Sequence, residues 1–252
     1  MKVGYAILYE DGELVISKNH TILSKKIYKD YGEFADTSVP WKNERKRINK
    51  VKILDQVKSN CMQKWFYYCI NLTSLIDFSY LDVSECTDFL EMFCGCKSLE
   101  KISTLQNWNV SNGRNFSSMF RFCTSLQDIS ALERWNVSNG TDFSYMFYIC
   151  TSLQNISALE RWNVSNGTKF SWMFDNCTSL QDIRALESWN VSNGTDFSWM
   201  FRYCTSLQNI SLPNSLRYLD ENMFKYCNPN LKIRWKQYLY TYADLLEYKK
   251  IY

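Results

Sequence analysis

Histidine and cysteine are the side chains most suited to catalysis or metal binding, and the numbers of both limit what this chain can do. The 252 residues include one histidine, His20, and ten cysteines. A histidine-rich zinc site needs several imidazoles, and the sequence contains no glycine-rich phosphate loop, HExxH motif or kinase motif. We therefore expect a protein that is not an enzyme and that uses no cofactor.

The cysteines follow a regular spacing rather than a metal-binding motif. Six of them recur every 27 residues: Cys69, Cys96, Cys123, Cys150, Cys177 and Cys204. Such a column is typical of small buried thiols along the axis of a repeat protein. Metal binding or disulfide formation is the alternative, but the close pair Cys94 and Cys96 is only a weak metal motif. We expect reduced, buried thiols.

The cysteine column belongs to a 27-residue repeat that positions the other side chains. Near-identical copies begin at Trp108, Trp135, Trp162 and Trp189. One copy alone buries too little apolar surface to offset the entropy of ordering it. A fixed period with one supersecondary unit per period is the mark of a solenoid.

Each copy predicts a turn, a helix and a strand. Four apolar residues stand at i, i+3, i+4 and i+7: Phe143, Met146, Phe147 and Cys150. This spacing predicts a short helix with an apolar stripe facing inward. The following segment, TSLQNIS, predicts a short strand, and the preceding Asn-Gly pair predicts a tight turn. The fold class is thus an α/β repeat, with short helices on one side of a solenoid and short strands on the other.

Three regions are predicted along the chain. Residues 1–60 form an N-terminal cap with a β-hairpin around Asp11 and Gly12 and a basic edge. Residues 61–235 form the solenoid, in which the last repeat shortens to 23 residues. Residues 236–252 form a C-terminal capping helix, because Leu239, Tyr242 and Leu246 have helical spacing.

The repeat resembles the BspA-like leucine-rich-repeat family. The unit W-N-V-S-N-x-T-D-F-S-x-M-F-x-x-C-T-S-L is similar to the family's long repeat, and LPNSLRYLDENMFKYCNPNLKI is similar to its 23-residue repeat. The resemblance implies a leucine-rich-repeat solenoid that acts as a non-catalytic binding scaffold. Many members are bacterial surface proteins, and related ones occur in phages, prophages and some protists. Where the family commonly has valine and methionine, this chain has glycine and phenylalanine at positions such as Gly140 and Phe143, which implies a paired volume swap in the core.

Some outward positions change between copies, although the apolar stripe does not. Exposed rows of tyrosine, tryptophan and arginine are typical of protein interfaces, so we expect a partner protein to bind on the helical side. Stacking of the rings for stability alone is the alternative. The predicted contact residues are Tyr145, Tyr148, Ile149, Trp172, Trp199, Arg202 and Tyr203.

The predicted strand side is a second candidate surface, and it is small and polar. It presents Asp128, Asn155, Asp182 and Asn209, together with Ser130, Ser157, Arg184 and Ser211. The family resemblance favours binding through the strands, whereas the residue types favour the aromatic side. We prefer the aromatic side.

Charge is distributed unevenly along the chain. The net charge is +4 over residues 1–60, −4 over residues 61–212 and +3 over residues 213–252. An acidic partner or nucleic acid could contact the basic residues Arg45, Lys46, Arg47, Lys50 and Lys52. A solvated, charged edge strand that discourages aggregation is the alternative. The acidic repeats would repel phosphates, so nucleic acid would bind only through this basic edge or indirectly.

The start of the chain has no long apolar run with a small-residue cleavage site, and no segment approaches the length of a membrane span. We therefore expect a cytoplasmic monomer that has no membrane partner and binds another protein. By analogy with phage-borne relatives, a narrower hypothesis is an inhibitor of a host defence complex such as an RNA-guided nuclease. The alternatives are a bacterial surface or virion-associated adhesin and a nucleic-acid-binding protein.

Overall fold

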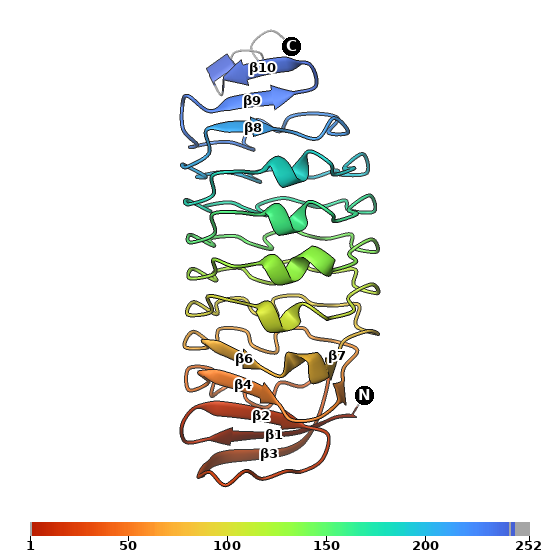
Figure 1. Ribbon diagram of the computed structural model, residues 1–252, viewed down its shortest axis with the longest axis vertical. Helices are drawn as coiled ribbons and strands as arrows, with labels where there is room; N and C mark the ends of the chain where they lie inside the picture. Colours follow the sequence, from red (N-terminus) through yellow and green to blue (C-terminus); the bar gives the residue numbers. More distant parts are fainter. Residues whose placement is uncertain (1, 242, 245–252) are drawn as a thin grey trace.

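Each copy of the repeat forms one coil, and the coils stack into an elongated rod (Figure 1). The computed structural model describes residues 2–241 and 243–244. Parallel bridges join residues 27 positions apart, such as Asn115 to Asp142 on one side of the rod and Asn155 to Asp182 on another. The predicted repeat fold is therefore confirmed.

The regular elements are short strands (β) and 3-10 helices (η). The strands nearest the N-terminus are β1 (Lys2–Tyr9), β2 (Glu13–Ser17), β3 (Ile27–Ala35), β4 (Lys50–Ile53), β5 (Val57–Lys58), β6 (Ser74–Ile76) and β7 (Leu81–Asp82). The 3-10 helices are η1 (Phe78–Tyr80), η2 (Ser103–Leu105), η3 (Ser130–Arg134), η4 (Ser157–Leu159) and η5 (Arg184–Leu186). The last strands are β8 (Asn209–Ser211), β9 (Lys232–Trp235) and β10 (Tyr238–Thr241). None of these named elements is an α-helix, and the only described residues in α-helical conformation are Ala243 and Asp244, after β10.

The interior is built from columns of identical side chains. Phe147 stacks on Phe120 of the preceding coil with ring centroids 5.7 Å apart, and both are fully buried. The indole Nε1 of Trp135 donates a hydrogen bond to the carbonyl of Leu105 at 3.0 Å. The six cysteines of the 27-residue column are buried free thiols, as predicted, and Cys150 donates its thiol to the carbonyl of Phe120 at 3.2 Å. Each coil is thus closed only by the coils above and below it.

A glycine in each coil leaves room for a phenylalanine ring. A Cβ atom added at Gly140 would lie 2.4 Å from Cζ of Phe143 and 2.9 Å from the carbonyl oxygen of Val137. The same clash with the corresponding phenylalanine occurs at Gly113, Gly167 and Gly194. The volume swap implied by the family resemblance is therefore a direct contact in the core.

The predicted helix over Phe143 to Cys150 is wrong, because this segment is a series of tandem turns. The amide of Met146 donates to the carbonyl of Phe143 in its own coil, whereas the amide of Tyr145 donates to Ser171 in the next coil. Tyr145 and Ile149 also have φ near +60°, which an α-helix excludes. The turns 143–146 and 147–150 each place their first and last side chains inward, which reproduces the i, i+3, i+4, i+7 spacing.

The predicted strand in TSLQNIS is reduced to a single bridge at Asn155, which is followed directly by η4. The bridges from Lys101 to Asp128 and from Asn155 to Asp182 therefore share one side of the rod with the 3-10 helices, where they continue the line of β4 and β6 upward to β8 (Figure 1). The prediction of helices and strands on opposite sides is wrong. We call this side the strand face and the side formed by the tandem turns the turn face.

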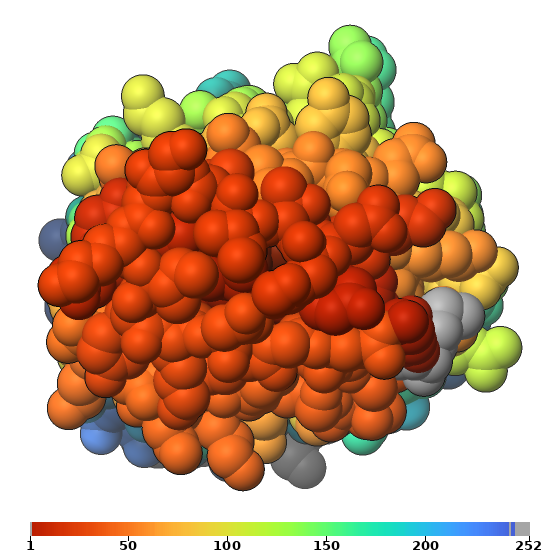
Figure 2. Space-filling model, turned by 90° about the horizontal axis from the view of Figure 1, so that it is seen from below, coloured from red at the N-terminus to blue at the C-terminus, as the bar shows by residue number. Residues whose placement is uncertain are grey.

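The N-terminal end of the rod carries a sheet with the strand order β3-β1-β2-β4-β6 (Figure 1). Seen from below, residues near the N-terminus cover most of this end (Figure 2). β1 and β2 form an antiparallel hairpin around Asp11 and Gly12, and Gly12 has a φ of 85°. β4 pairs in parallel with β2 on one side and with β6 on the other. The basic strand β4 is therefore an interior strand, and its interpretation as a charged edge strand is wrong.

The C-terminal end is a three-stranded sheet with the order β10-β9-β8. Residues Tyr238–Thr241 form strand β10, which pairs antiparallel with β9, where the capping helix of residues 236–252 was expected to begin. Within the rest of that predicted helix, Ala243 and Asp244 are helical, and residue 242 and residues 245–252 lie outside the described residues.

Candidate functional site

Three columns of side chains project from the turn face, one residue of each column per coil. The first column holds Lys64, Glu91, Ser118, Tyr145, Trp172 and Trp199. The second holds Tyr67, Cys94, Arg121, Tyr148, Asp175, Arg202 and Lys225. The third holds Tyr68, Gly95, Phe122, Ile149, Asn176, Tyr203 and Tyr226. All of the residues predicted as partner contacts fall in these columns, although they project from turns and not from a helix.

The first and third columns are left-handed turn positions. The φ angles are 60° at Trp172, 62° at Trp199 and 59° at Tyr203. Side chains other than glycine and asparagine are uncommon in this region, which costs an L-residue roughly 1–2 kcal/mol. Ser118 and Asn176 occupy the same columns with φ of 57° and 59°. The turn therefore forms with small polar residues and does not require aromatic rings.

The large side chains of the C-terminal coils form a ladder of rings. Trp172 stacks on Tyr145 at 5.5 Å and on Trp199 at 5.4 Å between centroids. Tyr203 stacks on Tyr226 at 4.6 Å, and these two residues are 38% and 51% exposed. Tyr145, Trp172 and Trp199 are half-buried because the rings cover one another. The ladder thus presents ring edges and partial faces rather than fully exposed rings.

A buried ion pair lies within the ladder. Arg202 places its guanidinium carbon 4.5 Å from the ring centroid of Trp172 and 4.8 Å from that of Trp199. Its Nη2 donates to Oδ2 of Asp175 at 2.7 Å, and Asp175 is completely buried. Burial raises the pKa of Asp175 above its ordinary value, and the hydrogen bonds from Arg202 only partly offset this effect.

Arg121 and Lys225 also lie over rings of the turn face. The guanidinium carbon of Arg121 is 4.6 Å from the ring centroid of Phe122 and 5.0 Å from that of Tyr148. Nζ of Lys225 is 5.0 Å from the centroid of Trp199. The sequence analysis did not select Arg121, Lys225 or Asp175. Arg121 and Asp175 stand 27 residues before and after Tyr148, and Lys225 stands 23 residues after Arg202 in the shorter last repeat. This spacing was the feature that could have identified them.

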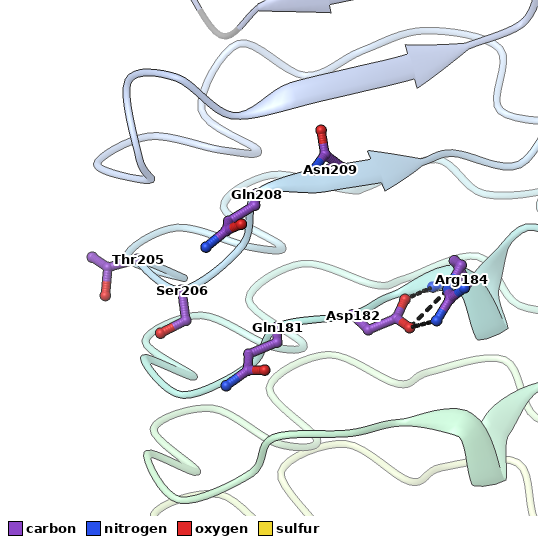
Figure 3. A pocket seen from close by; sticks show the side chains of 7 residues that line it. All are labelled: Gln181, Asp182, Arg184, Thr205, Ser206, Gln208 and Asn209. Carbon is purple, nitrogen blue, oxygen red and sulfur yellow. Dashed lines mark hydrogen bonds and ion pairs between the residues drawn. The ribbon is translucent and has the colours of Figure 1, made fainter.

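The strand face differs in size and polarity. Its Asp and Asn side chains accept hydrogen bonds from amides two residues ahead: Ser130 donates to Asp128 at 2.9 Å, and Arg184 donates to Asp182 at 2.8 Å. Hydrogen bonds from the Arg184 side chain also lower the pKa of Asp182. A polar hollow at the C-terminal end of this face is lined by Gln181, Asp182, Arg184, Thr205, Ser206, Gln208 and Asn209 (Figure 3).

The predicted basic contact residues differ in their surroundings. The guanidinium of Arg45 lies 5.0 Å from the ring centroid of Tyr67, and that of Arg47 lies 3.9 Å from the centroid of Tyr28. The other three are the exposed Lys46 and Lys50 and the half-buried Lys52, of which Lys50 and Lys52 belong to β4. Two of the cations are thus already engaged with rings.

Groups suited to metal binding or membrane crossing are absent from the residues that the structure describes. Within residues 2–241 and 243–244, no cluster of three or more His, Cys, Asp and Glu residues could hold a metal ion. His20 lies 2.6 Å from Asp30, measured from Nε2 to Oδ2, at the exposed surface. No helix in the same residues is long and apolar enough to span a membrane.

Comparisons with known proteins identify one family model. The model described as "Mycoplasma protein of unknown function, DUF285" matches residues 37–155 and 124–233. No curated protein matches the chain.

Solved structures with some similarity include three bacterial proteins. A leucine-rich repeat protein from Eubacterium ventriosum is 11% identical, with a TM-score of 0.33 over 90% of this chain and 95% of its own. A leucine-rich cell surface protein from Faecalibacterium prausnitzii is 14% identical, with a TM-score of 0.25 over 94% and 95%. A leucine-rich repeat protein from Bacteroides ovatus is 12% identical, with a TM-score of 0.28 over 93% and 87%. The repeat architecture described above rests on the geometry of this chain itself.

Proposed function

The chain belongs to the DUF285 family, and we propose that it is a BspA-like leucine-rich-repeat protein that binds another protein inside the cell through its turn face. Binding rather than catalysis is proposed because the columns of this face offer rings and cations but no nucleophile paired with a base. Tyrosine, tryptophan and arginine are the residues that contribute most to binding at protein interfaces.

One observation supports this proposal above the others. Ser118 and Trp172 occupy the same column with nearly the same φ, and the amide of each donates to the next coil, at 2.8 Å and 3.0 Å. The coil therefore forms equally with serine or tryptophan. Rings at these positions are an addition to the fold, and they gather in the C-terminal coils.

The ladder has a shape suited to a protein partner. Half-buried rings held by their neighbours lose little rotational freedom when a partner covers them. The cations Arg202 and Lys225 lie among the rings, so apolar contact and hydrogen bonding to a partner can occur side by side. The strand face lacks these features because its short polar side chains are used to hold their own turns.

Replacing both Trp172 and Trp199 with asparagine tests the proposal. Asparagine tolerates a left-handed backbone, so the variant should unfold within a few degrees of the wild type. It should lose the protein that wild-type chain captures in affinity purification from the native host with mass spectrometry. The matched control is Asn155→Ala with Arg184→Ala on the strand face, which should leave capture unchanged.

The opposite result has a clear meaning. Unchanged capture together with a large loss of thermal stability would show that the rings serve only as a structural spine. If the strand-face control variant loses the captured protein, the binding site lies on the strand face. The identity of the captured protein also tests the narrower hypothesis of an inhibitor of a defence complex.

A further inference from the structure

Two arginines occupy the same column of the turn face but differ in their electrostatic environment. Arg202 is bound by Asp175, which stands 27 residues earlier in the coil below, through Nε at 3.1 Å and Nη2 at 2.7 Å. Arg121 stands three coils earlier in that column, and the residue 27 positions before it is Cys94. The repeat position that holds a carboxylate below Arg202 therefore holds a thiol below Arg121.

Among the described residues, no carboxylate forms an ion pair or a hydrogen bond with Arg121. In the described part of the chain, its guanidinium contacts only rings, those of Phe122, Tyr145 and Tyr148. Its Nε is buried without a hydrogen-bond partner. Burial raises the pKa of the Cys94 thiol to about 12, so this neighbour stays neutral at physiological pH. A guanidinium held in this way by three rings is oriented but lacks an anion.

We infer that Arg121 receives a carboxylate from a protein partner, which supplies in trans what Asp175 supplies to Arg202 within the chain. This inference rests on the proposed function of the turn face and specifies the chemistry of its partner. A guanidinium is planar and weakly hydrated, so it can keep its ring contacts while its nitrogens donate to an incoming carboxylate. The partner is therefore a protein with an exposed Asp or Glu at the point where it meets the rings.

A protein carboxylate fits the surface better than the phosphates of a nucleic acid. Successive coils rise by about 4.8 Å, so Arg121 and Arg202 are separated by roughly 14 Å, and Arg202 is already neutralised by Asp175. A nucleic-acid strand carries one charge per about 3.4 Å. It would lie along repeats whose net charge is −4 over residues 61–212. A single side-chain carboxylate can meet Arg121 without this repulsion.

The chain itself offers a substitution that tests this inference. Cys94→Asp places a carboxylate below Arg121 as Asp175 lies below Arg202, whereas Cys94→Asn has the same shape without the charge. The probe is fluorescein-labelled hexaglutamate, followed by fluorescence anisotropy at low salt. We expect Cys94→Asp to bind the probe about tenfold more weakly than Cys94→Asn, because the ion pair formed within the chain occupies Arg121.

A second variant keeps the test decisive if Cys94→Asp does not fold. Arg121→Gln should weaken hexaglutamate binding by about the same factor, whereas Lys50→Gln in the basic N-terminal cluster should not. Equal binding by Arg121→Gln and the wild type would overturn the inference. Binding of a dT12 oligonucleotide that exceeds hexaglutamate binding and depends on Arg121 would also overturn it, in favour of nucleic acid.

The inference and the proposed function can fail separately. If hexaglutamate binding ignores Arg121 while the Trp172 and Trp199 variant still loses its captured protein, only the carboxylate assignment fails. If capture does not depend on the tryptophans, the proposed function fails whatever the probe does.

Discussion

The strand face and the turn face are built on the same interior, yet they use their side chains for different purposes. On the strand face, Asp128, Asn155 and Asp182 alternate between acid and amide, and each accepts the amide two residues ahead at 2.6–2.9 Å. Only an acceptor oxygen is needed there, so the alternation leaves the fold unchanged. On the turn face, Ser118 and Trp172 occupy one column and share a backbone bond to the next coil, but neither side chain holds its own turn. The comparison teaches that the outward polar column of the strand face serves the fold, whereas the fold does not require the rings of the first turn-face column.

The largest predicted difference between the faces is in the free energy of unfolding that is lost when an aspartate is removed. Asp175→Ala should lower the free energy of unfolding by about 3 kcal/mol, because it leaves Arg202 without a carboxylate in a mostly buried site. Asp182→Ala on the strand face should cost about 1 kcal/mol or less, since the side chain of its partner Arg184 is 78% exposed. Urea unfolding of both variants measures the difference.

A further variant shows whether the cost at Asp175 comes from its buried ion pair with Arg202. Arg202→Gln should match Asp175→Ala to within about 1 kcal/mol if the ion pair is the unit that matters. If Asp175→Ala and Asp182→Ala lower the free energy of unfolding equally, the burial of Asp175 does not make its ion pair more important than that of Asp182.

A smaller effect is expected from backbone strain on the turn face. Ile149 has a φ of 58°, which a β-branched residue adopts at a cost, whereas Asn176 occupies the same column at 59°. Ile149→Asn should raise the free energy of unfolding by roughly 0.5–1 kcal/mol, because relief of strain exceeds the lost apolar contact. The reciprocal change Asn176→Ile should lower it by a similar amount.

Thermal unfolding of the two single variants, and of the double swap, checks this prediction. If Ile149→Asn is destabilising, the isoleucine contributes to packing, and the third column belongs to the fold as much as the strand face does.

The repeat explains which parts of this comparison the sequence could predict. Positions that never change, such as Phe147 and Cys150, were predicted to be buried and are buried. The contact between Gly140 and Phe143 was implied by their joint departure from the family pattern. These features depend on side-chain volume, which the sequence states directly.

The local backbone geometry was harder to predict from the sequence. Tandem turns produce the same apolar spacing as a helix, so periodicity could not separate them. Left-handed positions are usually occupied by glycine or asparagine, but here they are occupied by residues such as Tyr145 and Trp172, which do not indicate this conformation. The ion pair between Asp175 and Arg202 joins residues 27 positions apart, and it became visible only when the coils were stacked.

The smallest predicted effect is a change of stability on acidification that has opposite signs for one aspartate on each face. Hydrogen bonds from Arg184 lower the folded-state pKa of Asp182 below 3.8, so its contribution to stability is present at neutral pH and is lost as pH falls below about 4. Burial raises the folded-state pKa of Asp175 above 3.8, so the folded state takes up this proton before the unfolded state does. The contribution of Asp175 to stability therefore increases as pH falls through its folded-state pKa.

Melting temperatures measured between pH 7 and pH 3 for Asp182→Asn and Asp175→Asn test this sign. The stability advantage of the wild type over Asp182→Asn should shrink on acidification, whereas its advantage over Asp175→Asn should grow. Each variant serves as the control for the other, because both remove one carboxylate and keep an amide of the same shape. Parallel trends would mean that the two carboxylates are equally solvated, and the distinction between a solvated strand face and a turn face with a buried charge would then fail.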